Sequence, residues 1–466
     1  MKTIKDLPSP ESKFLIGHLS EFKPDNIHNI LESWASKVGD IYKISLLGKQ
    51  FIVSADPDFN TQVLRQRPDK FQRFSKIGDV LKEMGIMGVF NAEGESWKKQ
   101  RKLTSAALNM KNTISYFPII HDVCYRLFNK LKKLAATDNK IQVQEEMMRF
   151  TVDITSRVAF GFPMNTLEEK DEVIQQHLEK IFPMINHRIN SLIPFWKVIK
   201  SKKDKSLDIS LESIKETIKT FIYEAKKRLE TVPGLKEKSS NFLEALLIEQ
   251  EKEGSFTDEE IIGNVFTMLL AGEDTTSNSI SWTIYYLTQH PHIVERIREE
   301  ANNIYPNEDL PPDYETLSAL KYTEAVVFES MRLKSVSPVL FMQALEQVEI
   351  NGLQINKGMT LMLQNKVAQT QPQNFVYPNE FLPDRWLRSH GCPITGAHNP
   401  DVIKVFGAGP RFCPGKTLAM HEIITAVSMI CKNFEIKLAV DVKEIKEVFS
   451  FTMYPHNLWV SFKSIV

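Results

Sequence analysis

The strongest constraint on the fold is a helical pattern that begins at Thr257 and continues to about His290, where Pro291 ends it. Thr257 and Glu260 form a capping box, in which each side chain can bond to the backbone amide of the other residue. At about 1.5 Å per residue, a helix of about 33 residues is about 50 Å long and can cross a whole domain. Its centre at 265–270 is apolar except for one threonine. We therefore expect a buried helix around which the rest of the chain packs.

The remaining periodicity predicts a mainly α fold with a smaller β-rich part. Residues 40–47 and 50–54 are rich in β-branched and aromatic side chains and predict a β-hairpin, whereas helical spacing dominates farther along the chain. No repeat and no Gly/Ser linker divides the 466 residues. We expect a single domain over 1–466, with its β-containing part at about 1–60 and a helical body at about 61–466.

Composition excludes several classes of protein. With 42% hydrophobic residues and 58 basic against 58 acidic side chains, the chain is neither disordered nor a strongly basic binder of nucleic acid. Its cysteines, Cys124, Cys392, Cys413 and Cys431, include no close pair of the kind that forms a disulfide scaffold or a zinc knuckle. Residues 1–18 contain no apolar run as long as that of a signal peptide or a membrane span. We expect a soluble cytoplasmic protein without a transmembrane anchor.

Two acids and two threonines interrupt the long helical pattern directly after its apolar centre, in the run Ala-Gly-Glu-Asp-Thr-Thr at 271–276. Charged side chains in the middle of a helix usually face water, and threonines there can bond back to carbonyls of the preceding turn. Taken alone, the run favours a solvated stripe on the helix. The alternative is a functional site, which the rest of the chain favours.

A second unusual segment lies near the C-terminus, where residues 406–415 contain three glycines and two prolines. This composition specifies a rigid, irregular loop whose glycines let backbone amides approach another group closely. Cys413 lies at the end of the loop, two residues after Arg411 and just before an apolar helix at about 418–430. The guanidinium and the helix N-terminus would both stabilise a thiolate, which suits a metal-bound sulfur. A lone cysteine is more often a buried structural residue, but that explanation leaves the constrained loop unaccounted for.

The loop carries the residues of a known signature. Phe406, Gly409, Arg411, Cys413 and Gly415 match Phe-x-x-Gly-x-Arg-x-Cys-x-Gly, the haem-binding signature of the cytochrome P-450 family. The chain resembles that family over nearly its whole length. The resemblance implies the P-450 fold, with a long central helix that crosses the haem, and a haem b cofactor whose axial ligand is the thiolate of Cys413.

Four further segments resemble family motifs in the expected order. Glu329 and Arg332 match Glu-x-x-Arg, and Arg385 lies in a segment similar to the second arginine motif. An acid and an arginine three residues apart are by themselves an ordinary surface pair. Trp97 and Arg101 match Trp-x-x-x-Arg, although a core tryptophan beside a snorkelling arginine has the same spacing. The acid and threonine run matches the family's oxygen-binding groove.

The resemblance assigns a role to each of these residues. Glu329, Arg332 and Arg385 would form a buried structural network. Asp274 would relay protons and Thr275 would donate a hydrogen bond to bound oxygen, which makes these two the expected catalytic residues. The expected cofactor-binding residues are Trp97, Arg101, Ala271, Gly272, Phe406, Gly407, Arg411, Cys413 and Gly415.

Two segments depart from the family pattern. Residues 341–344 read Phe-Met-Gln-Ala where many members carry an arginine or histidine that binds a haem propionate. Residues 368–372 lack the usual His-Arg-Asp before their proline. We therefore expect one propionate contact to be missing or replaced.

The resemblance implies a monooxygenase that inserts one atom of O2 into a C–H bond of its substrate. The expected substrate-binding residues are Met84, Met87, Phe90, Phe266, Leu270, Val339 and Phe451. Such an apolar lining fits a hydrophobic, lipid-like substrate such as a fatty acid, terpenoid or steroid, although a stripe of Met and Phe is more often plain core. The apolar connection at 192–196 is expected at the access channel, as a lid or as a shallow membrane contact.

Electrons must come from a separate protein, because the haem domain fills the chain and leaves no flavin or iron–sulfur segment. Five lysines are expected on one face near the haem-binding segments: Lys98, Lys99, Lys102, Lys404 and Lys416. A basic face suits an acidic ferredoxin or flavodoxin with its reductase, while ordinary solvated lysines are the alternative. We expect a monomer of bacterial origin that binds no nucleic acid.

Two other functions stay open. A haem-thiolate peroxygenase or isomerase that uses peroxide needs no external electrons, but such relatives usually lack the acid and threonine pair present at Asp274 and Thr275. A non-enzymatic haem sensor needs neither a proton relay nor a face for electron transfer.

Overall fold

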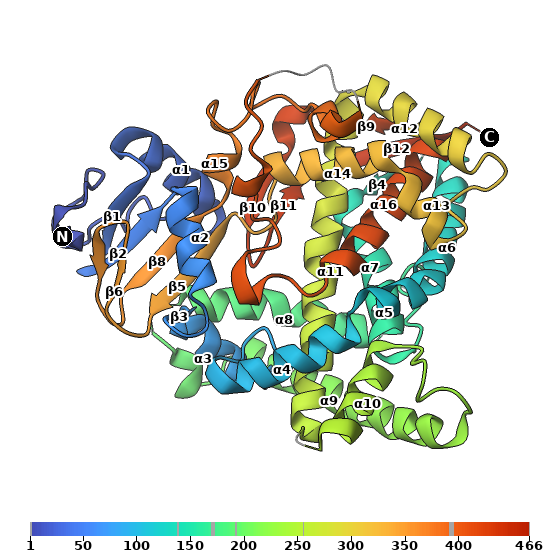
Figure 1. The fold of residues 1–466 in the computed structure, drawn as a ribbon, viewed down its shortest axis with the longest axis horizontal. Coiled ribbons are helices and arrows are strands. Elements are labelled where there is room, and N and C mark those ends of the chain that lie inside the picture. The colour runs from blue at the N-terminus through green and yellow to red at the C-terminus, as the bar shows by residue number, and fades with distance from the viewer. Residues whose placement is uncertain are drawn as a thin grey trace. The chain divides into compact units, whose positions relative to one another are not determined.

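The computed structural model describes residues 2–465 except 138, 169–172, 192, 255 and 391–395. The chain divides into two compact units, each made of segments that are far apart in the sequence (Figure 1). Unit 1 comprises Met1–Asp79, Phe328–Cys413 and Glu447–Tyr454. Unit 2 comprises Val80–Val327, Pro414–Lys446 and Pro455–Val466.

Unit 1 is built around a five-stranded sheet with the strand order β1-β2-β8-β5-β3. Its strands are β1 (Ile41–Leu46), β2 (Lys49–Ser54), β3 (Phe71–Arg73), β5 (Val339–Ala344) and β8 (Thr360–Gln364). The predicted hairpin is confirmed, since β1 and β2 pair antiparallel. β8 then lies parallel to β2, and β5 joins β8 antiparallel. The β-rich part therefore extends beyond the N-terminal residues and takes in two strands from the second half of the chain.

Both faces of this sheet are covered, because successive side chains of a strand point to opposite faces. Ile52 of β2 packs with α2 (Pro57–Arg65) in one hydrophobic cluster, whereas Val53 packs with α1 (Ile27–Val38) in another. All five residues of the inner strand β8 are buried. Unit 1 also contains α15 (Lys366–Gln369) and the pair β6 (Val348–Ile350) and β7 (Leu353–Ile355). Residues 447–454 of a further pair, β10 (Lys446–Phe449) and β11 (Met453–His456), belong to unit 1 as well.

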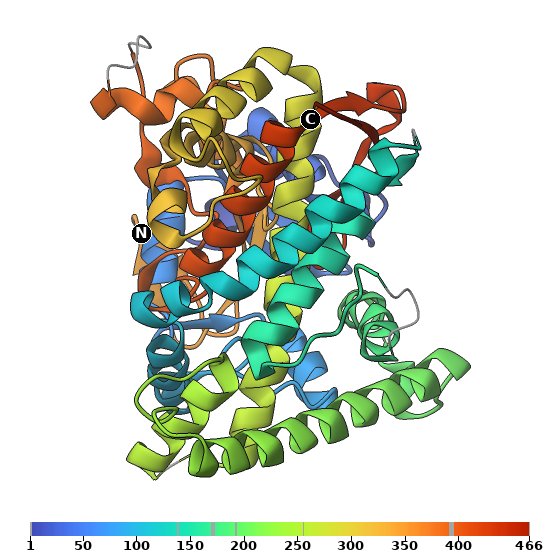
Figure 2. The same ribbon diagram turned by 90° about the vertical axis from the view of Figure 1, so that its right-hand side faces the viewer.

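Unit 2 is mostly helical, and α11 (Asp258–Gln289) runs through it, drawn in yellow (Figures 1 and 2). The predicted capping box is confirmed: Glu260 N donates to Thr257 Oγ1 at 3.2 Å, and Thr257 N donates to Glu260 Oε2 at 2.9 Å. The residues of α11 from 261 to 270 are all buried, which confirms the burial predicted for its centre at 265–270. α7 (Val143–Phe160) and α16 (Lys416–Asn433) pack against this helix.

The other helices are α3 (Ser75–Glu83), α4 (Gly94–Ala107), α5 (Met110–Ser115), α6 (Phe117–Ala135), α8 (Val173–Asn190), α9 (Lys202–Thr231), α10 (Phe242–Glu253), α12 (Pro291–Ile304), α13 (Tyr314–Ala319) and α14 (Lys321–Leu333). A three-stranded sheet of unit 2 contains β4 (Lys140–Gln142), β9 (Phe434–Leu438) and β12 (Trp459–Ser464). The fold class predicted from the sequence, mainly α with a smaller β-rich part, is confirmed. No helix among the described residues is both long enough and apolar enough to cross a membrane.

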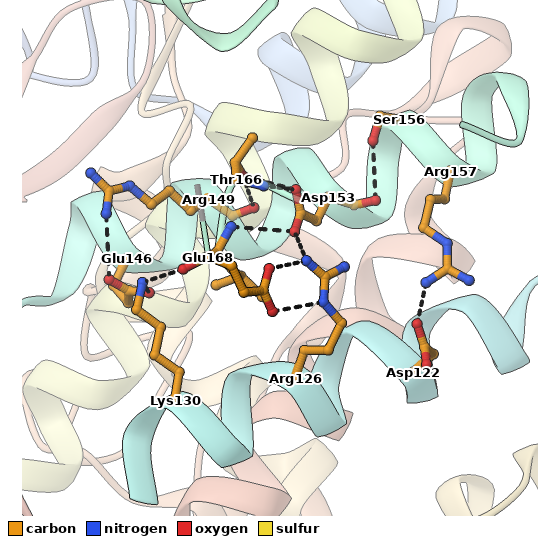
Figure 3. A network of polar contacts seen from close by, with 11 residues as sticks. Asp122, Arg126, Lys130, Glu146, Arg149, Asp153, Ser156, Arg157, Thr166 and Glu168 are labelled. Atoms are coloured by element: carbon orange, nitrogen blue, oxygen red, sulfur yellow. Dashed lines mark hydrogen bonds and ion pairs between the residues drawn. The ribbon is translucent and has the colours of Figure 1, made fainter. Parts of the chain in front are cut away.

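A polar network on α6 and α7 anchors the turn that precedes α8 (Figure 3). The Asp153 carboxylate accepts hydrogen bonds from Thr166 N at 2.7 Å, Thr166 Oγ1 at 2.8 Å and Leu167 N at 3.3 Å. Arg126 pairs with this carboxylate at 3.0 Å and also with Glu168. Burial raises the pKa of Asp153, although these donors and the guanidinium oppose the rise. The network thus fixes residues 166–168, which precede α8 in the chain, to the helices α6 and α7.

Candidate functional site

The cysteine loop of unit 1 has a backbone that its glycines make possible. Gly407 and Gly409 have φ values of +76° and +68°, a region that other residues rarely adopt. A Cβ atom added to Gly409 would lie 2.6 Å from the carbonyl oxygen of Leu64, so the loop packs directly on α2. Cys413 N donates to the carbonyl oxygen of Phe406 at 2.8 Å, which closes the loop on itself. The position of Cys413 is therefore set by backbone contacts.

Cys413 differs from the other described cysteines in its exposure. Cys124 and Cys431 are fully buried, and burial raises the pKa of both thiols, to about 12 for Cys431. Cys413 is half-buried, and α16 starts three residues after it. Cys392 lies outside the described residues. Among the described cysteines, Cys413 alone has a thiol that a bound group such as a metal ion can reach.

Glu329, Arg332 and Arg385 come together in unit 1, and all three side chains are completely buried. Arg332 donates to both carboxylate oxygens of Glu329, through Nε at 2.9 Å and Nη2 at 2.8 Å. Arg385 Nε, Trp386 Nε1 and Leu382 N add bonds of 3.0, 3.0 and 2.9 Å. The carboxylate therefore accepts five hydrogen bonds, which compensates for its loss of water.

The two guanidiniums also organise the chain that leads to the cysteine loop. Arg332 donates to the carbonyl oxygens of Gln369, Pro378 and Glu380, at 2.7, 2.6 and 3.1 Å. Arg385 donates to those of Val376 and Tyr377, at 2.8 and 3.1 Å. The two arginines thereby link the irregular backbone from 369 to 380 to the buried Glu329 carboxylate. The role of this network is structural.

In unit 2, the acid and threonine run lies on α11 with its members in different surroundings. Glu273 is only 1% exposed, so the solvated-stripe interpretation is wrong for this residue. Asp274 and Thr275 are half-buried, and Ala271 is exposed. Thr275 Oγ1 donates to the Ala271 carbonyl at 2.7 Å, and Asn278 Nδ2 donates to Asp274 Oδ1 at 3.1 Å. The Thr275 proton is thus held within the helix, and the Asp274 carboxylate is oriented by an amide one turn later.

Gly272 allows α11 to approach α7 closely. A Cβ atom at this position would lie 2.9 Å from Thr155 Oγ1 and 3.0 Å from its methyl carbon. One residue later, the backbone carbonyl of Glu273 accepts a hydrogen bond from Thr151 Oγ1 at 2.9 Å. Threonines of α7 therefore contact the helix at the acid and threonine run.

The residues of the Trp-x-x-x-Arg motif lie one turn apart on α4, where Trp97 is buried and Arg101 is half-buried. Their helix is held to α11 by two residues that the sequence analysis missed. Asn264 Nδ2 donates to Gln100 Oε1 at 3.1 Å, and Asn264 Oδ1 accepts from Val89 N at 2.9 Å. The available signal was an asparagine in an otherwise apolar stretch of helix, because a buried amide needs partners.

Two glycines, also missed, bring the 84–90 segment against α11. A Cβ atom on Gly263 would lie 2.7 Å from the Met87 carbonyl carbon, and one on Gly88 would lie 2.3 Å from the Gly263 carbonyl oxygen. Backbone therefore packs on backbone here. A glycine inside an apolar helix was the signal that could have indicated such a contact.

The expected substrate-binding residues lie in both units. In unit 2, Met84, Phe266 and Leu270 are buried, whereas Met87 is 45% exposed. Phe90 is half-buried. In unit 1, Val339 is buried in β5, and Phe451 is half-buried in the turn between β10 and β11.

The connection at 192–196 is anchored by its tryptophan. Trp196 is buried, and its Nε1 donates to Glu83 at 3.0 Å. Ile193 and Phe195 are exposed, and Leu192 lies outside the described residues.

The five lysines differ in how far they are engaged. Lys98 pairs with Glu95 at the surface, and Lys102 and Lys416 are exposed. Lys99 pairs with Glu260 at 2.8 Å and lies over the Phe256 ring. Lys404 is half-buried in unit 1, and burial lowers its pKa.

The segments that depart from the family pattern have a structural place in unit 1. Residues 341–344 form most of β5, where Gln343 Oε1 accepts from Gln72 Nε2 at 3.2 Å. Gln369 stands in the second segment and is completely buried. Both positions carry uncharged side chains that pack within the unit.

Comparison with known proteins shows the family of this chain. The family model described as Cytochrome P450 matches residues 7–462. Cytochrome P450 3A7 of Homo sapiens is 28% identical over 92% of this chain and 85% of its own length, and cytochrome P450 27C1 of Danio rerio is 28% identical over 96% and 84%. The Protein LUTEIN DEFICIENT 5, chloroplastic, of Arabidopsis thaliana is 24% identical over 89% and 70%.

The fold has a solved counterpart as well. The crystal structure of the cytochrome P450DA heme domain superposes with a TM-score of 0.86 over 99% of this chain and 98% of that one, at 23% identity. The chain therefore belongs to the cytochrome P450 family of haem-thiolate monooxygenases, as its sequence motifs predicted.

Proposed function

We propose that this cytochrome P450 hydroxylates a hydrophobic, lipid-like substrate and that Cys413 is the residue that ligates its haem. The observation that carries the assignment is the half-buried thiol of Cys413 in a loop closed by its own backbone. The test is the absorption spectrum of the reduced holoprotein under carbon monoxide, with and without Cys413.

The proposed cofactor-binding residues fit a haem in their chemistry. Cys413 offers a thiol that is accessible, in contrast to the two buried thiols. Arg101 and Arg411, both half-buried, offer guanidiniums with a geometry suited to carboxylates such as haem propionates. Gly407 and Gly415 add no side chain that would exclude a flat ring, whereas the space beside Gly272 is taken by Thr155 of α7. When bound, a thiolate-ligated haem activates O2 and supplies the oxidant for C–H hydroxylation.

The residues of α11 would deliver protons. Asp274 can exchange a proton with solvent because it is half-buried, and the Asn278 amide holds its carboxylate in one orientation. Thr275 Oγ1 already donates its proton to the Ala271 carbonyl, so its lone pairs are directed away from that bond. The hydroxyl can accept a hydrogen bond in this state and must rotate in order to donate one. The proposed relay therefore includes rotation about the Thr275 side chain.

Replacing Asp274 by asparagine together with Thr275 by alanine should slow product formation by roughly a hundredfold or more, because general acid catalysis is lost. Electrons should be diverted to hydrogen peroxide. The measurement is product formed per NAD(P)H consumed, with peroxide determined in parallel. Thr288→Ala is the matched control, since Thr288 Oγ1 only donates to the Tyr285 carbonyl of the same helix. Equal coupling in wild type and double variant would contradict the relay, and it would favour a peroxide-using enzyme or a haem sensor.

The substrate class rests on the apolar character of Met84, Phe266, Leu270 and Val339. Fatty acids, terpenoids and steroids should displace water from the iron and shift the haem absorption, whereas polar metabolites of similar size should not. A ligand screen by absorption spectroscopy makes the comparison. A response confined to polar compounds would refute the lipid-like substrate class.

Members of this family take electrons from a redox partner, and for this chain we propose an acidic ferredoxin or flavodoxin. Changing Lys98 and Lys102 to glutamate should slow reduction by about tenfold at low salt, because attraction becomes repulsion, and the difference should shrink as salt rises. Stopped-flow reduction by a plant-type [2Fe–2S] ferredoxin measures the effect. Lys133→Glu, on exposed α6 surface, is the control. Equal rates for all three proteins would mean that the lysines of α4 are ordinary solvated residues.

A further inference from the structure

The hairpin of β10 and β11 carries Phe451 in its turn and meets the core of unit 1 through Phe449 and Met453. Residues 447–451 are all half-buried. β10 and β11 pair as a two-stranded sheet. In addition, Ser450 N donates to the Thr452 carbonyl at 3.0 Å, and Met453 N donates to the Val336 carbonyl at 2.9 Å. Phe449 gives the β10 strand an apolar contact with the core around α1. Glu447, on the same strand, adds a polar one.

The polar contact is a charge cluster around Glu447, the second residue of β10. His28 Nε2 of α1 lies 3.0 Å from Glu447 Oε2. Lys334, directly after α14, pairs with the other oxygen. Lys366 of α15 lies 4.0 Å from Oε2 and pairs with Glu32 of α1 at 3.1 Å. One carboxylate thus connects the hairpin to three separate elements of unit 1.

The cluster is sheltered from water, which strengthens its interactions. The side chains of Glu447, Lys334 and Lys366 are 17%, 18% and 15% exposed, and that of His28 is 2% exposed. Burial alone raises the pKa of Glu447, but the hydrogen bond from His28 and the charges of Lys366 and Lys334 hold it well below its usual value. Burial lowers the pKa of Lys334 despite the opposing charge of Glu447. The carboxylate is therefore ionised at neutral pH and compensates charges that would otherwise be costly.

We propose that Glu447 is a positioning residue for the substrate: its carboxylate fixes the β10–β11 hairpin and thereby the place at which Phe451 meets the substrate. The residue does not touch the reacting atoms. It acts on specificity through Phe451, four positions later in the same hairpin. This inference rests on the proposed function, because Phe451 contacts a substrate only if the hairpin borders the haem pocket as the family resemblance implies.

The test compares two iron-binding probes of different size in the holoprotein, imidazole and 4-phenylimidazole. Glu447→Gln should weaken the affinity for 4-phenylimidazole by about five- to tenfold, because a wall that contacts the phenyl ring is displaced. The affinity for imidazole, which is too small to reach the hairpin, should stay within about twofold of wild type. Both affinities come from titrations of the haem absorption band. Glu444→Gln, an exposed glutamate three residues earlier, is the matched control and should change neither value.

A double-variant cycle separates positioning from general loosening of the fold. In a Phe451→Ala background, Glu447→Gln should have no further effect on 4-phenylimidazole, because Glu447 acts through the missing ring. Additive effects, or an equal loss of both probes, would overturn the proposal. Where Glu447→Gln does not fold, Glu447→Gln with Lys334→Met removes the acid and its buried partner together and enters the same cycle. The carbon monoxide spectrum of each variant shows whether thiolate ligation is intact, so a failure of the positioning role is distinguishable from a failure of the proposed function.

Discussion

Replacing Cys413 by serine should abolish the strongly red-shifted absorption band that the reduced holoprotein shows under carbon monoxide, and product formation should fall to the background rate. The thiolate donates electron density that favours O–O cleavage, and a serine hydroxyl does not ionise at neutral pH to replace it. The fold should survive, because the half-buried Cys413 side chain adds little to the core. Far-UV circular dichroism and the spectrum of the variant reconstituted with haem measure both expectations.

Cys431→Ala is the control for this experiment. Its thiol is completely buried in α16, with a pKa raised by burial to about 12, so it has no role as a thiolate. The variant should keep the red-shifted band and lose only packing stability. An unshifted band in freshly prepared, folded wild-type protein would contradict the assignment of Cys413, as would a normal band in Cys413→Ser.

Replacing Glu329 by glutamine should lower the free energy of unfolding by about 3–5 kcal/mol, or prevent folding, because it leaves two buried guanidiniums without their counter-charge. Arg332 and Arg385 have no exposed surface and cannot turn to water. The two guanidiniums should then also lose hydrogen bonds to the carbonyl oxygens of the 369–380 backbone. Urea denaturation followed by tryptophan fluorescence and the haem content of the purified protein give the two readouts.

Glu324→Gln provides the comparison on the same helix. Glu324 also has a partner three residues away, Lys321, at 3.5 Å, but this pair lies at the surface. Its loss should change stability by less than about 1 kcal/mol. Similar stability losses for the two variants would mean that the buried network does not hold the core of unit 1.

Features that depend on neighbouring residues were predictable from the sequence. The capping box of α11, its buried centre and the β1–β2 hairpin all match the predictions, because each arises from hydrogen bonds and periodicity within a short stretch. The residues around Cys413 could likewise be recognised from their spacing. The same spacing rules could not tell whether Glu329 and Arg332 were a surface pair or a buried one.

Contacts between segments that are distant in the sequence could not be predicted from local sequence patterns. Nothing near β2 indicates that β8 will lie parallel to it, since that pairing depends on the path of some three hundred intervening residues. Asn264 shows the same limit, because its two partners come from different segments of unit 2. An amide inside an apolar helix indicates that partners exist, but not which residues they are.

The sequence by itself determined the family, the helix that carries Asp274 and Thr275, and the loop that carries Cys413, because each can be recognised from residue spacing and composition within a short stretch of chain. The tertiary structure decided which charges are buried. Arg385 reaches Glu329 across 56 residues, and His28 reaches Glu447 across 419. Burial is a property of the packed chain: removing one partner of an acid and base pair costs less than about 1 kcal/mol at the surface, but about 3–5 kcal/mol where the other charge is left buried without a counter-charge.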